Sequence, residues 1–301
     1  MLCIDEVHEG VRHILFATDP LLDATIAWDV VERCDQAAID AFLDDIRAMG
    51  FSPRVVVTDG SPLYKRALLE RWSEVEHQLC IFHVLANINR DVLAAARAIL
   101  KELPRPRKHP RGRPKKRGRK RKKDDRRKFV ADRLHLVVKR RDRFSEDDEA
   151  DWTRIVGIDA RFDTLKRFVD AVHGLFERGI SKRTARLRRT LLLRNEAYAG
   201  NAHLERAMRR LALEKFEKMI VFMRYTNLDR TNNHVERGNR SFRMLQKTRY
   251  RRRRRRTICL VLELHVLRRW RKHPLYAARA KRPKRLRRRS QSPPSTSRRA
   301  A

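Results

Sequence analysis

VVVTDG, residues 55–60, is the stretch that decides the fold. Its first four residues are all β-branched, and such an uninterrupted run favours a strand that is buried on both faces of a sheet. Ser61 and Pro62 follow at once and predict a helix that begins just beyond Asp59. A buried strand that passes through a short turn into a helix is typical of α/β proteins. We therefore expect an α/β fold with Asp59 at the end of a central strand.

The rest of the first hundred residues alternates strand and helix patterns in the same way. Short apolar runs predict strands at residues 2–4, 13–18 and 79–82 and a weaker one at residues 25–31, and apolar residues at helical spacing predict helices over residues 37–49 and 84–99. Gly50 marks the expected end of the first helix. Asp5 directly follows the first predicted strand, just as Asp59 follows the buried one.

The charge of the chain is large and unevenly distributed. The 301 residues hold 74 Lys+Arg and 37 Asp+Glu, a formal net charge of +37. Residues 1–100 carry 9 basic and 16 acidic residues, a net of −7, so residues 101–301 carry the remaining +44. This excess points to a polyanionic partner, and nucleic acid is the first expectation. The net negative charge of residues 1–100 argues against a protein that only coats DNA by electrostatic attraction.

Composition also excludes several classes of protein. No apolar run approaches the length of about 18 residues that a membrane-spanning helix needs. The first residues contain no basic segment, so we expect no secretory signal. The four cysteines (Cys3, Cys34, Cys80 and Cys259) are scattered, which argues against a disulfide framework and fits a reducing compartment.

Residues 101–128 break the α/β pattern. They hold 17 Lys+Arg in 28 positions with Pro and Gly between them, so we expect a solvated, disordered linker. Helical periodicity resumes beyond the linker and predicts helices over residues 162–176, 212–223 and 258–270. The tail over residues 276–301 is basic, contains Pro and Ser, and has no core-forming pattern, so it is also expected to be disordered.

Three carboxylates fall at positions suited to chemistry. Asp5 and Asp59 follow predicted strands, and Glu236 lies in TNNHVER, residues 231–237, near the start of a helix that Thr231 could cap. Carboxylates so placed can hold two divalent ions about 3.5–4 Å apart, which stabilise the attacking and leaving oxygens in phosphodiester chemistry. Oxygen ligands suit Mg²⁺ or Mn²⁺. The ordinary alternative for a single Asp after a strand is a turn or cap residue.

Taken together, four blocks resemble those of DDE transposases: CIDE at residues 3–6, VTDG at 57–60, HQLCIFH at 77–83 and TNNHVER at 231–237. The nearest branch is the Mutator-like and related bacterial insertion-sequence enzymes. The resemblance covers most of residues 1–270, and the blocks occur in the family's order. It implies a ribonuclease H-like mixed sheet, with a Cys-x-x-His block after the second Asp and a mainly α-helical insertion before the Glu.

The resemblance also implies the layout and activity of the chain. Residues 1–100 would form the first part of the catalytic core, 101–128 the basic linker, 129–228 the helical insertion, 229–275 the helices that complete the core, and 276–301 the tail. Asp5, Asp59 and Glu236 would be the catalytic metal ligands for Mg²⁺ or Mn²⁺. The reaction would be cleavage and strand transfer of double-stranded mobile-element DNA by a homo-oligomer, associated with the nucleoid in the cytoplasm.

Two further pairs of residues are expected to support the site. The resemblance implies that Cys80 and His83 support the active site or contact DNA. A zinc site would need four ligands, and with His77 only three lie nearby, so we favour a structural or supporting role, the ordinary alternative being a buried thiol and a satisfied imidazole. Asn232 and Asn233 could orient Glu236 or bind DNA, or simply form a turn.

Basic residues after Glu236 are candidates for contacts with DNA. Arg240, Arg243 and Lys247 follow it by 4, 7 and 11 positions, which places them on one face of the expected helix, where they could track substrate phosphates. The alternative is a surface ion pair between Arg240 and Glu236, worth about 0.3–0.5 kcal/mol.

A second group of candidates lies in the basic linker. Arg111 and Arg113, followed by Lys115 and Lys116, resemble the core of an AT-hook, whose extended Arg-Gly-Arg segment enters a narrow A·T minor groove. The favoured alternative is a polybasic linker that binds phosphates without sequence preference. A nuclear-import signal is a further reading, which the resemblance to insertion-sequence enzymes argues against.

Two other functions remain open at this point: a noncatalytic basic nucleic-acid-binding protein, and an inactive transposase remnant. The acidic character of residues 1–100 argues against the noncatalytic binding protein. Met1 lies four residues before Asp5, which leaves no room for an N-terminal end-recognition module. We therefore expect an N-terminally shortened transposase with little preference for element ends, the alternative being a start site further upstream.

Overall fold

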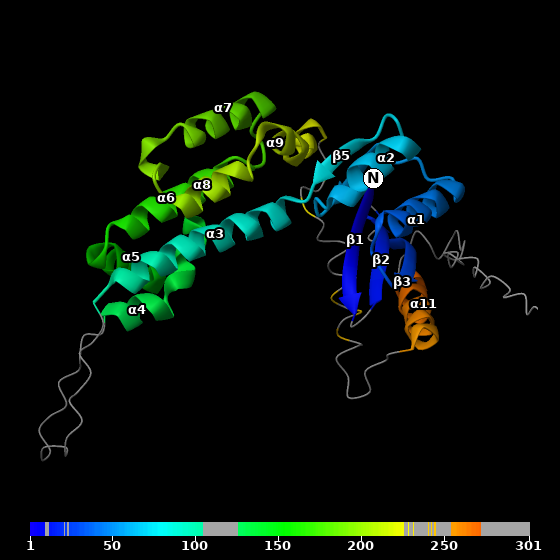
Figure 1. Ribbon diagram of the computed structural model, residues 1–301, viewed down its shortest axis with the longest axis horizontal. Helices are drawn as coiled ribbons and strands as arrows, with labels where there is room; N and C mark the ends of the chain where they lie inside the picture. Colours follow the sequence, from blue (N-terminus) through cyan, green and yellow to red (C-terminus); the bar gives the residue numbers. More distant parts are fainter. Residues whose placement is uncertain are drawn as a thin grey trace, which may run out of the picture. The chain divides into compact units, whose positions relative to one another are not determined.

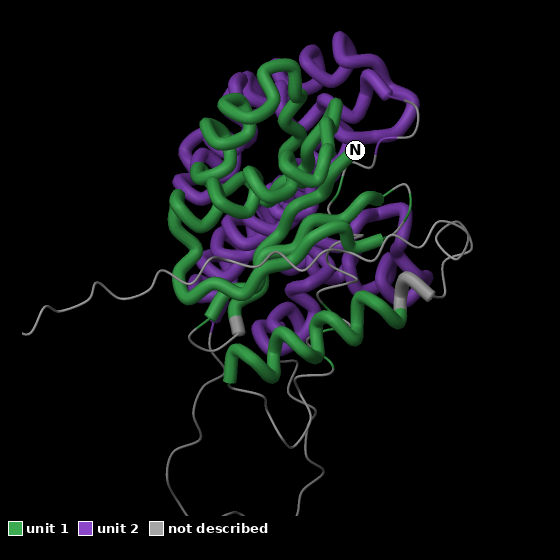
Figure 2. The backbone as a smooth tube through the Cα atoms, turned by 90° about the vertical axis from the view of Figure 1, so that its right-hand side faces the viewer, with its two compact units in different colours: residues 1–80, 229–301 green, residues 81–228 purple. Residues whose placement is uncertain are grey.

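The structure is a computed structural model that describes residues 1–9, 12–20, 22, 24–104, 126–225, 228, 231, 240, 242, 244 and 254–271. The chain forms two compact units (Figures 1 and 2). Unit 1 comprises residues 1–80 together with 229–301, and unit 2 comprises residues 81–228. Unit 1 is therefore built from two separate parts of the chain, between which the whole of unit 2 is inserted.

Unit 1 is a five-stranded mixed sheet with helices on both faces. Its elements are β1 (Leu2–Glu9), β2 (Arg12–Asp19), β3 (Ala24–Val31), α1 (Gln36–Ala48), β4 (Val55–Thr58), α2 (Pro62–Arg71), β5 (Glu76–Leu79) and α11 (Arg255–Arg271). The strand order is β3-β2-β1-β4-β5. β1, β2 and β3 pair antiparallel, whereas β4 is parallel to both β1 and β5. This is a ribonuclease H-like sheet, so the predicted fold class is confirmed.

Each face of the sheet has its own apolar cluster because strand residues alternate between the two faces. In β1, Leu2 and Ile4 belong to the cluster under α1 and α2. Cys3 and Val7 belong to the opposite cluster, which α11 covers through Ile258, Cys259, Leu262 and Val266. The predicted helices over 37–49 and 258–270 are thus present as α1 and α11, and both are needed to bury the sheet.

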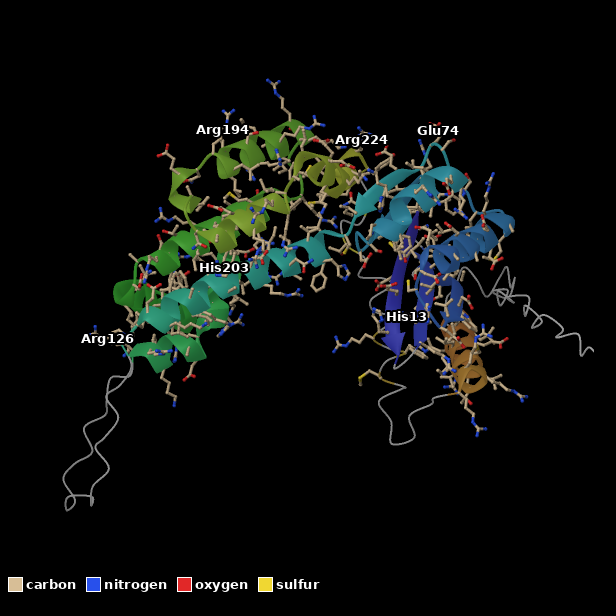
Figure 3. All side chains as sticks on the ribbon, in the orientation of Figure 1. His13, Glu74, Arg126, Arg194, His203 and Arg224 are labelled. Atoms are coloured by element: carbon tan, nitrogen blue, oxygen red, sulfur yellow. The ribbon has the colours of Figure 1, made fainter. Side chains whose placement is uncertain are left out.

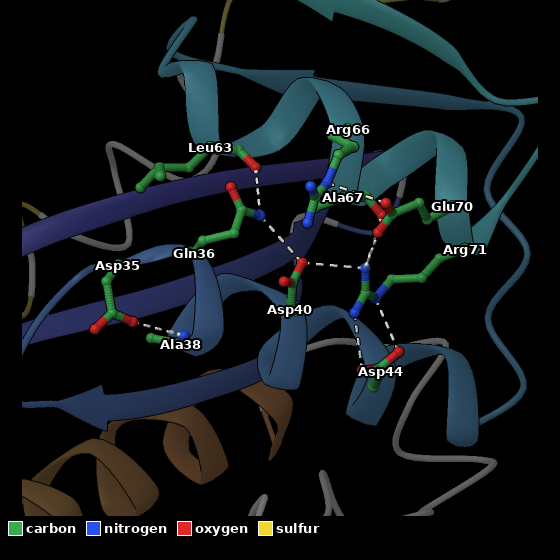
Figure 4. A network of polar contacts seen from close by, with 10 residues as sticks. All are labelled: Asp35, Gln36, Ala38, Asp40, Asp44, Leu63, Arg66, Ala67, Glu70 and Arg71. Carbon is green, nitrogen blue, oxygen red and sulfur yellow. Dashed lines mark hydrogen bonds and ion pairs between the residues drawn. The ribbon is translucent and has the colours of Figure 1, made fainter.

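The pair α1 and α2 is joined by a polar network centred on Arg71 (Figure 4). Its guanidinium donates to Asp40 Oδ1 at 3.1 Å and to Asp44 Oδ2 at 2.8 Å. Gln36 donates to the same Asp40 oxygen and to the backbone oxygen of Leu63, both at 3.1 Å. Because the Arg71 side chain is largely buried, these contacts fix how the two helices pack.

All the regular elements among the described residues of unit 2 are helices. Its elements are α3 (Ile81–Glu102), α4 (Arg126–Asp132), η1 (Leu134–Val137), η2 (Arg141–Arg143), α5 (Glu146–Ile158), α6 (Arg161–Gly174), α7 (Lys182–Leu193), η3 (Glu196–Tyr198), α8 (Ala202–Arg209), α9 (Leu213–Met219) and η4 (Val221–Arg224). The predicted helix over 162–176 is α6, and the one over 212–223 is α9 followed by the short η4. No helix in the described ranges has both the length and the apolar character needed to cross a membrane.

Two strand predictions are wrong in their limits. β1 continues to Glu9 because it pairs with β2 along its whole length, so Asp5 lies inside the strand rather than after it. Residues 79–82 are not a strand: β5 ends at Leu79, and Ile81 already begins α3. The apolar run fits either structure, and the helical stripe of α3, which extends back to buried Ile81, decides between them.

The ends of the expected basic linker are also helical. Residues 101–102 finish α3 and residues 126–128 begin α4, while 105–125 lie outside the described residues, as does the tail over 276–301. In the chain, unit 1 gives way to unit 2 between Cys80 and Ile81. The reason is that α3 is one continuous helix whose buried face packs within unit 2, against α6 and α8.

Candidate active site

Asp5 and Asp59 are brought together by the register of two parallel strands. β1 and β4 pair Leu2 with Val56 and Cys3 with Val57. Continuing this register by two residues sets Asp5 opposite Asp59, the residue that follows β4. Neighbouring strands lie about 4.8 Å apart, so the two residues are neighbours although 54 positions separate them in the sequence. Asp5 is buried and projects from the face of β1 that carries Cys3 and Val7.

The turn after β4 orients the Asp59 carboxylate. Its Oδ1 accepts a hydrogen bond from the backbone N–H of Ser61 at 2.9 Å. Gly60 has φ +94°, a left-handed conformation that favours glycine, and this allows the tight turn into α2. The Ser61 side chain, expected to cap α2, makes no capping hydrogen bond, so Asp59 closes the turn in its place.

Thr58 supports the same turn from β4. Its hydroxyl lies 2.8 Å from Nε2 of His77 on β5 and accepts from the backbone N–H of Gly60 at 3.4 Å. The backbone N–H of Cys80 donates to the Thr58 carbonyl at 2.8 Å, which continues the ladder past the end of β5. The position of Asp59 is therefore set by side-chain and backbone contacts on both sides.

Three more polar residues, Glu6, Cys34 and Tyr64, lie on the α1 and α2 side of the sheet and were not singled out from the sequence. Cys34, between β3 and α1, donates its thiol to the Glu6 carboxylate. Burial, this hydrogen bond and the charges of Glu6 and Asp59 raise the pKa of Cys34 to about 12. The pKa of Tyr64 on α2 is raised well above its ordinary value by burial and then by Glu6, Asp59, Cys34 and Asp5.

The Cys34 thiol and the Tyr64 phenol are both uncharged near neutral pH. Because both stay protonated, neither adds negative charge to the carboxylates. Glu6 follows Asp5 directly in the sequence, and this adjacency was the only signal for it. Nothing in the local sequence marked Cys34 or Tyr64, because tertiary packing alone brings them to the carboxylates.

The donor set fits a hard divalent cation. Asp5 and Asp59 supply carboxylate oxygens from adjacent strands, the ligand type that Mg²⁺ and Mn²⁺ prefer. Within the described ranges, no three His, Cys, Asp or Glu side chains gather into a metal-binding group. The expected third ligand, Glu236, lies outside the described residues, as do Asn232 and Asn233.

Phe242, which follows Glu236 by six residues, packs against the sheet. Residues 240, 242 and 244 are helical, and Phe242 is fully buried in the cluster that contains Cys3 and Val57. Its ring centroid lies 6.3 Å from that of Phe16, and Phe16 is the β2 residue that pairs with Asp5. Phe242 is therefore packed on the face of the sheet that also carries Asp5. Arg240 is exposed.

Comparison with known families identifies the chain. The profile of the ISL3 family of DDE transposases matches residues 2–255. The chain belongs to this transposase family. None of the curated proteins compared with it gives a match. The match extends from β1 through unit 2 to the first residue of α11, so it contains Asp5, Asp59 and Glu236. DDE transposases generally use divalent metals and act on DNA. The expected Mutator-like branch stays a prediction.

The transposase's remaining predicted site residues are placed as follows. Cys80 is buried in the same cluster as Cys3. His83 lies in the first turn of α3, half-buried, with its ring edge-on to that of Phe82 at 5.6 Å. Cys80 ends unit 1, whereas His83 belongs to unit 2. Six predicted DNA contacts lie outside the described residues: Arg111, Arg113, Lys115, Lys116, Arg243 and Lys247.

Proposed function

We propose that this transposase is a metal-dependent enzyme that cleaves the ends of a bacterial insertion-sequence element and joins the resulting 3′-hydroxyls to target DNA. The observation that supports this best is the parallel register of β1 and β4, which sets Asp5 opposite Asp59. Two carboxylates side by side on a ribonuclease H-like sheet, in a chain of this family, are suited to phosphodiester chemistry and have no evident role in a passive DNA-binding protein.

Asp5, Asp59 and Glu236 would hold Mg²⁺ or Mn²⁺. Bound there, the metal would lower the pKa of the attacking hydroxyl and stabilise the leaving oxygen. Asp59 holds one oxygen against the Ser61 N–H, which leaves Oδ2 to face a cation. Phe242, six residues after Glu236 in the sequence, is buried beside Phe16, the β2 residue that pairs with Asp5, and this supports including Glu236 in the proposed site.

The DNA itself would be held by basic residues outside the carboxylate pair. We propose that Arg240, Arg243 and Lys247 contact phosphates beside the cleaved bond, and that the tract over residues 105–125 adds binding without sequence preference. Cys80, His83 and the two asparagines before Glu236 would support the site rather than react. Acting on two element ends would require a homo-oligomer, which we include in the proposal.

A strand-cleavage assay on the element's own ends, with Mg²⁺ or Mn²⁺, tests the proposal. Asp5→Asn, Asp59→Asn and Glu236→Gln should each abolish cleavage, because each removes a charged ligand while keeping side-chain volume. Glu74→Gln is a matched control: it makes the same change at an exposed carboxylate in the loop before β5 and should cleave normally (Figure 3).

The assay also separates the alternatives. If the unaltered protein binds DNA and cuts none under any metal condition, the inactive-remnant hypothesis is correct for this chain. If it cuts and Asp59→Asn cuts equally well, the carboxylate assignment is wrong.

A further inference from the structure

Helix α3 of unit 2 has two faces of opposite character. Its buried face carries apolar residues: Ile81, Ile88, Val92, Ala95, Ala96 and Ile99. It packs against α6 and α8, which run along one side of α3 in Figure 1. Both acidic residues of the helix are neutralised within unit 2. Asp91 pairs with Arg210 at 2.7 Å, and Glu102 pairs with Arg161 at 2.6 Å.

The opposite face carries a row of exposed basic residues. Arg90, Arg97 and Lys101 are separated by seven and four positions, so they lie nearly in line along the helix, about 10.5 and 6 Å apart along its axis. Among the residues that the structure describes, none of the three has a carboxylate partner. The helix therefore presents three uncompensated charges on one line.

Several other arginines of unit 2 are paired with carboxylates. Arg186 forms two 2.7 Å hydrogen bonds with Glu217, and Arg188 lies 2.7 Å from Glu177. Those arginines hold α7 against neighbouring segments and so have a structural use. The α3 row makes no such contact, although its like charges repel one another, so stability of the fold does not account for it.

The surface around the row suits close approach of an extended polyanion. Ala86 is exposed and Ala94 is half-buried, and both flank the row with side chains too short to hold a ligand away from the helix. The charges extend over about 16.5 Å of axis, and phosphates follow one another by about 3.4 Å of duplex axis on each strand. Flexible Arg and Lys side chains can thus reach three phosphates of one duplex.

We propose that the row Arg90, Arg97 and Lys101 binds the phosphate backbone of double-stranded DNA and forms a contact surface of unit 2 that is separate from the basic tract and from the carboxylate site. The proposal rests on the proposed function only in taking DNA as the partner. It concerns binding, which requires no metal, so it can be tested apart from catalysis.

The test measures binding of a labelled mixed-sequence duplex to the full chain by fluorescence anisotropy, in EDTA, over a series of salt concentrations. The variant Arg90→Gln/Arg97→Gln/Lys101→Gln should reduce the log–log salt slope by about 2.7, three times the 0.9 expected for each phosphate contact. Affinity at low salt should fall at least tenfold. Arg90→Lys/Arg97→Lys keeps the charges and should keep the slope.

A matched control removes the same charge elsewhere in unit 2. Arg194→Gln/Arg206→Gln/Lys215→Gln alters exposed basic residues outside α3, of which Arg194 is labelled in Figure 3. Its slope should fall by less than about one. An unchanged slope in the α3 variant, or an equal fall in the control, would overturn the proposal. Circular dichroism verifies that both variants fold.

The result is independent of the proposed catalysis. If the unaltered protein does not cleave DNA, the proposed function is wrong, and the binding measurement is still valid. Conversely, if the protein cleaves DNA normally and the α3 substitutions do not change binding, the proposed function holds and the proposed DNA-binding surface on α3 is wrong.

Discussion

Gly60→Ala is the substitution that most directly links backbone conformation to the carboxylate pair. Gly60 has φ +94°, and a Cβ added there would meet only Leu79 Cδ2 at 3.5 Å, an ordinary contact. The cost is therefore one of backbone strain, about 1–2 kcal/mol for a left-handed residue. Reduced entropy of the unfolded chain offsets about 0.4–1 kcal/mol of it. We expect a net loss of about 1 kcal/mol and a fall of a few degrees in Tm.

The effect on activity should be larger than the effect on stability. Relaxing the strain moves the peptide between Gly60 and Ser61, and that peptide's N–H holds Asp59 Oδ1. Gly50→Ala is the control: Gly50 has φ +86° with nothing within 4 Å of an added Cβ, and it ends α1 away from the carboxylates. Thermal melts and strand cleavage should show equal destabilisation, with at least tenfold slower cleavage for Gly60→Ala alone. Equal cleavage by both variants would refute the argument that this turn sets the Asp59 geometry.

Three other predictions concern packing and protonation. Phe242→Ala should lower the free energy of unfolding by about 3–5 kcal/mol in urea titrations, and Phe242→Leu should restore most of it, because Phe242 is fully buried against Phe16. At pH 8, iodoacetamide should alkylate Cys34 at least a hundredfold more slowly than free cysteine, because the pKa of Cys34 is near 12; peptide mass spectrometry measures the rate. Glu6→Gln should speed the alkylation. A rate for Cys34 equal to that of free cysteine would contradict the assignment. Burial and the Arg140 charge lower the pKa of His173 to about 4, so as the pH falls from about 6.5 to 4 the unfolded chain binds a proton that the folded chain does not. The free energy of unfolding should therefore drop by about 2–3 kcal/mol over that window. In urea unfolding, His173→Gln should flatten this pH dependence, and an unflattened curve would show that another group is responsible.

Elements with strong local patterns could be predicted from the sequence. The valine run is β4, and the apolar stripes are α1, α6 and α11, because burial of one helical face or of a whole strand leaves a periodic trace. The limits of β1 and β5 could not be predicted in the same way. Pairing with β2 extends β1 beyond Asp5, and packing within unit 2 draws Ile81 into a helix. Both effects depend on partners distant in the sequence.

The candidate site shows the same division. Asp5 and Asp59 were found because their blocks resemble those of a known family, and the register of β1 and β4 then supplies a physical reason for their proximity. Cys34 and Tyr64 could not be found, since a thiol in a loop and a phenol in a helix have no distinctive local pattern. Their significance comes from burial next to carboxylates.

The insertion of unit 2 between β5 and α11 has a consequence for biosynthesis. A ribosome releases all five strands, α1 and α2 before any residue of unit 2, and α11 begins only 176 positions after the end of β5. Until then the sheet can be covered on one face alone, and the cluster around Cys3, Phe16 and Val57 lacks Phe242, Ile258 and Leu262. Unit 2, in contrast, is continuous and can finish folding first. The nascent chain therefore passes through a stage in which unit 2 has folded while one apolar face of the sheet is still exposed. Exposed apolar surface of this kind promotes chaperone binding or aggregation.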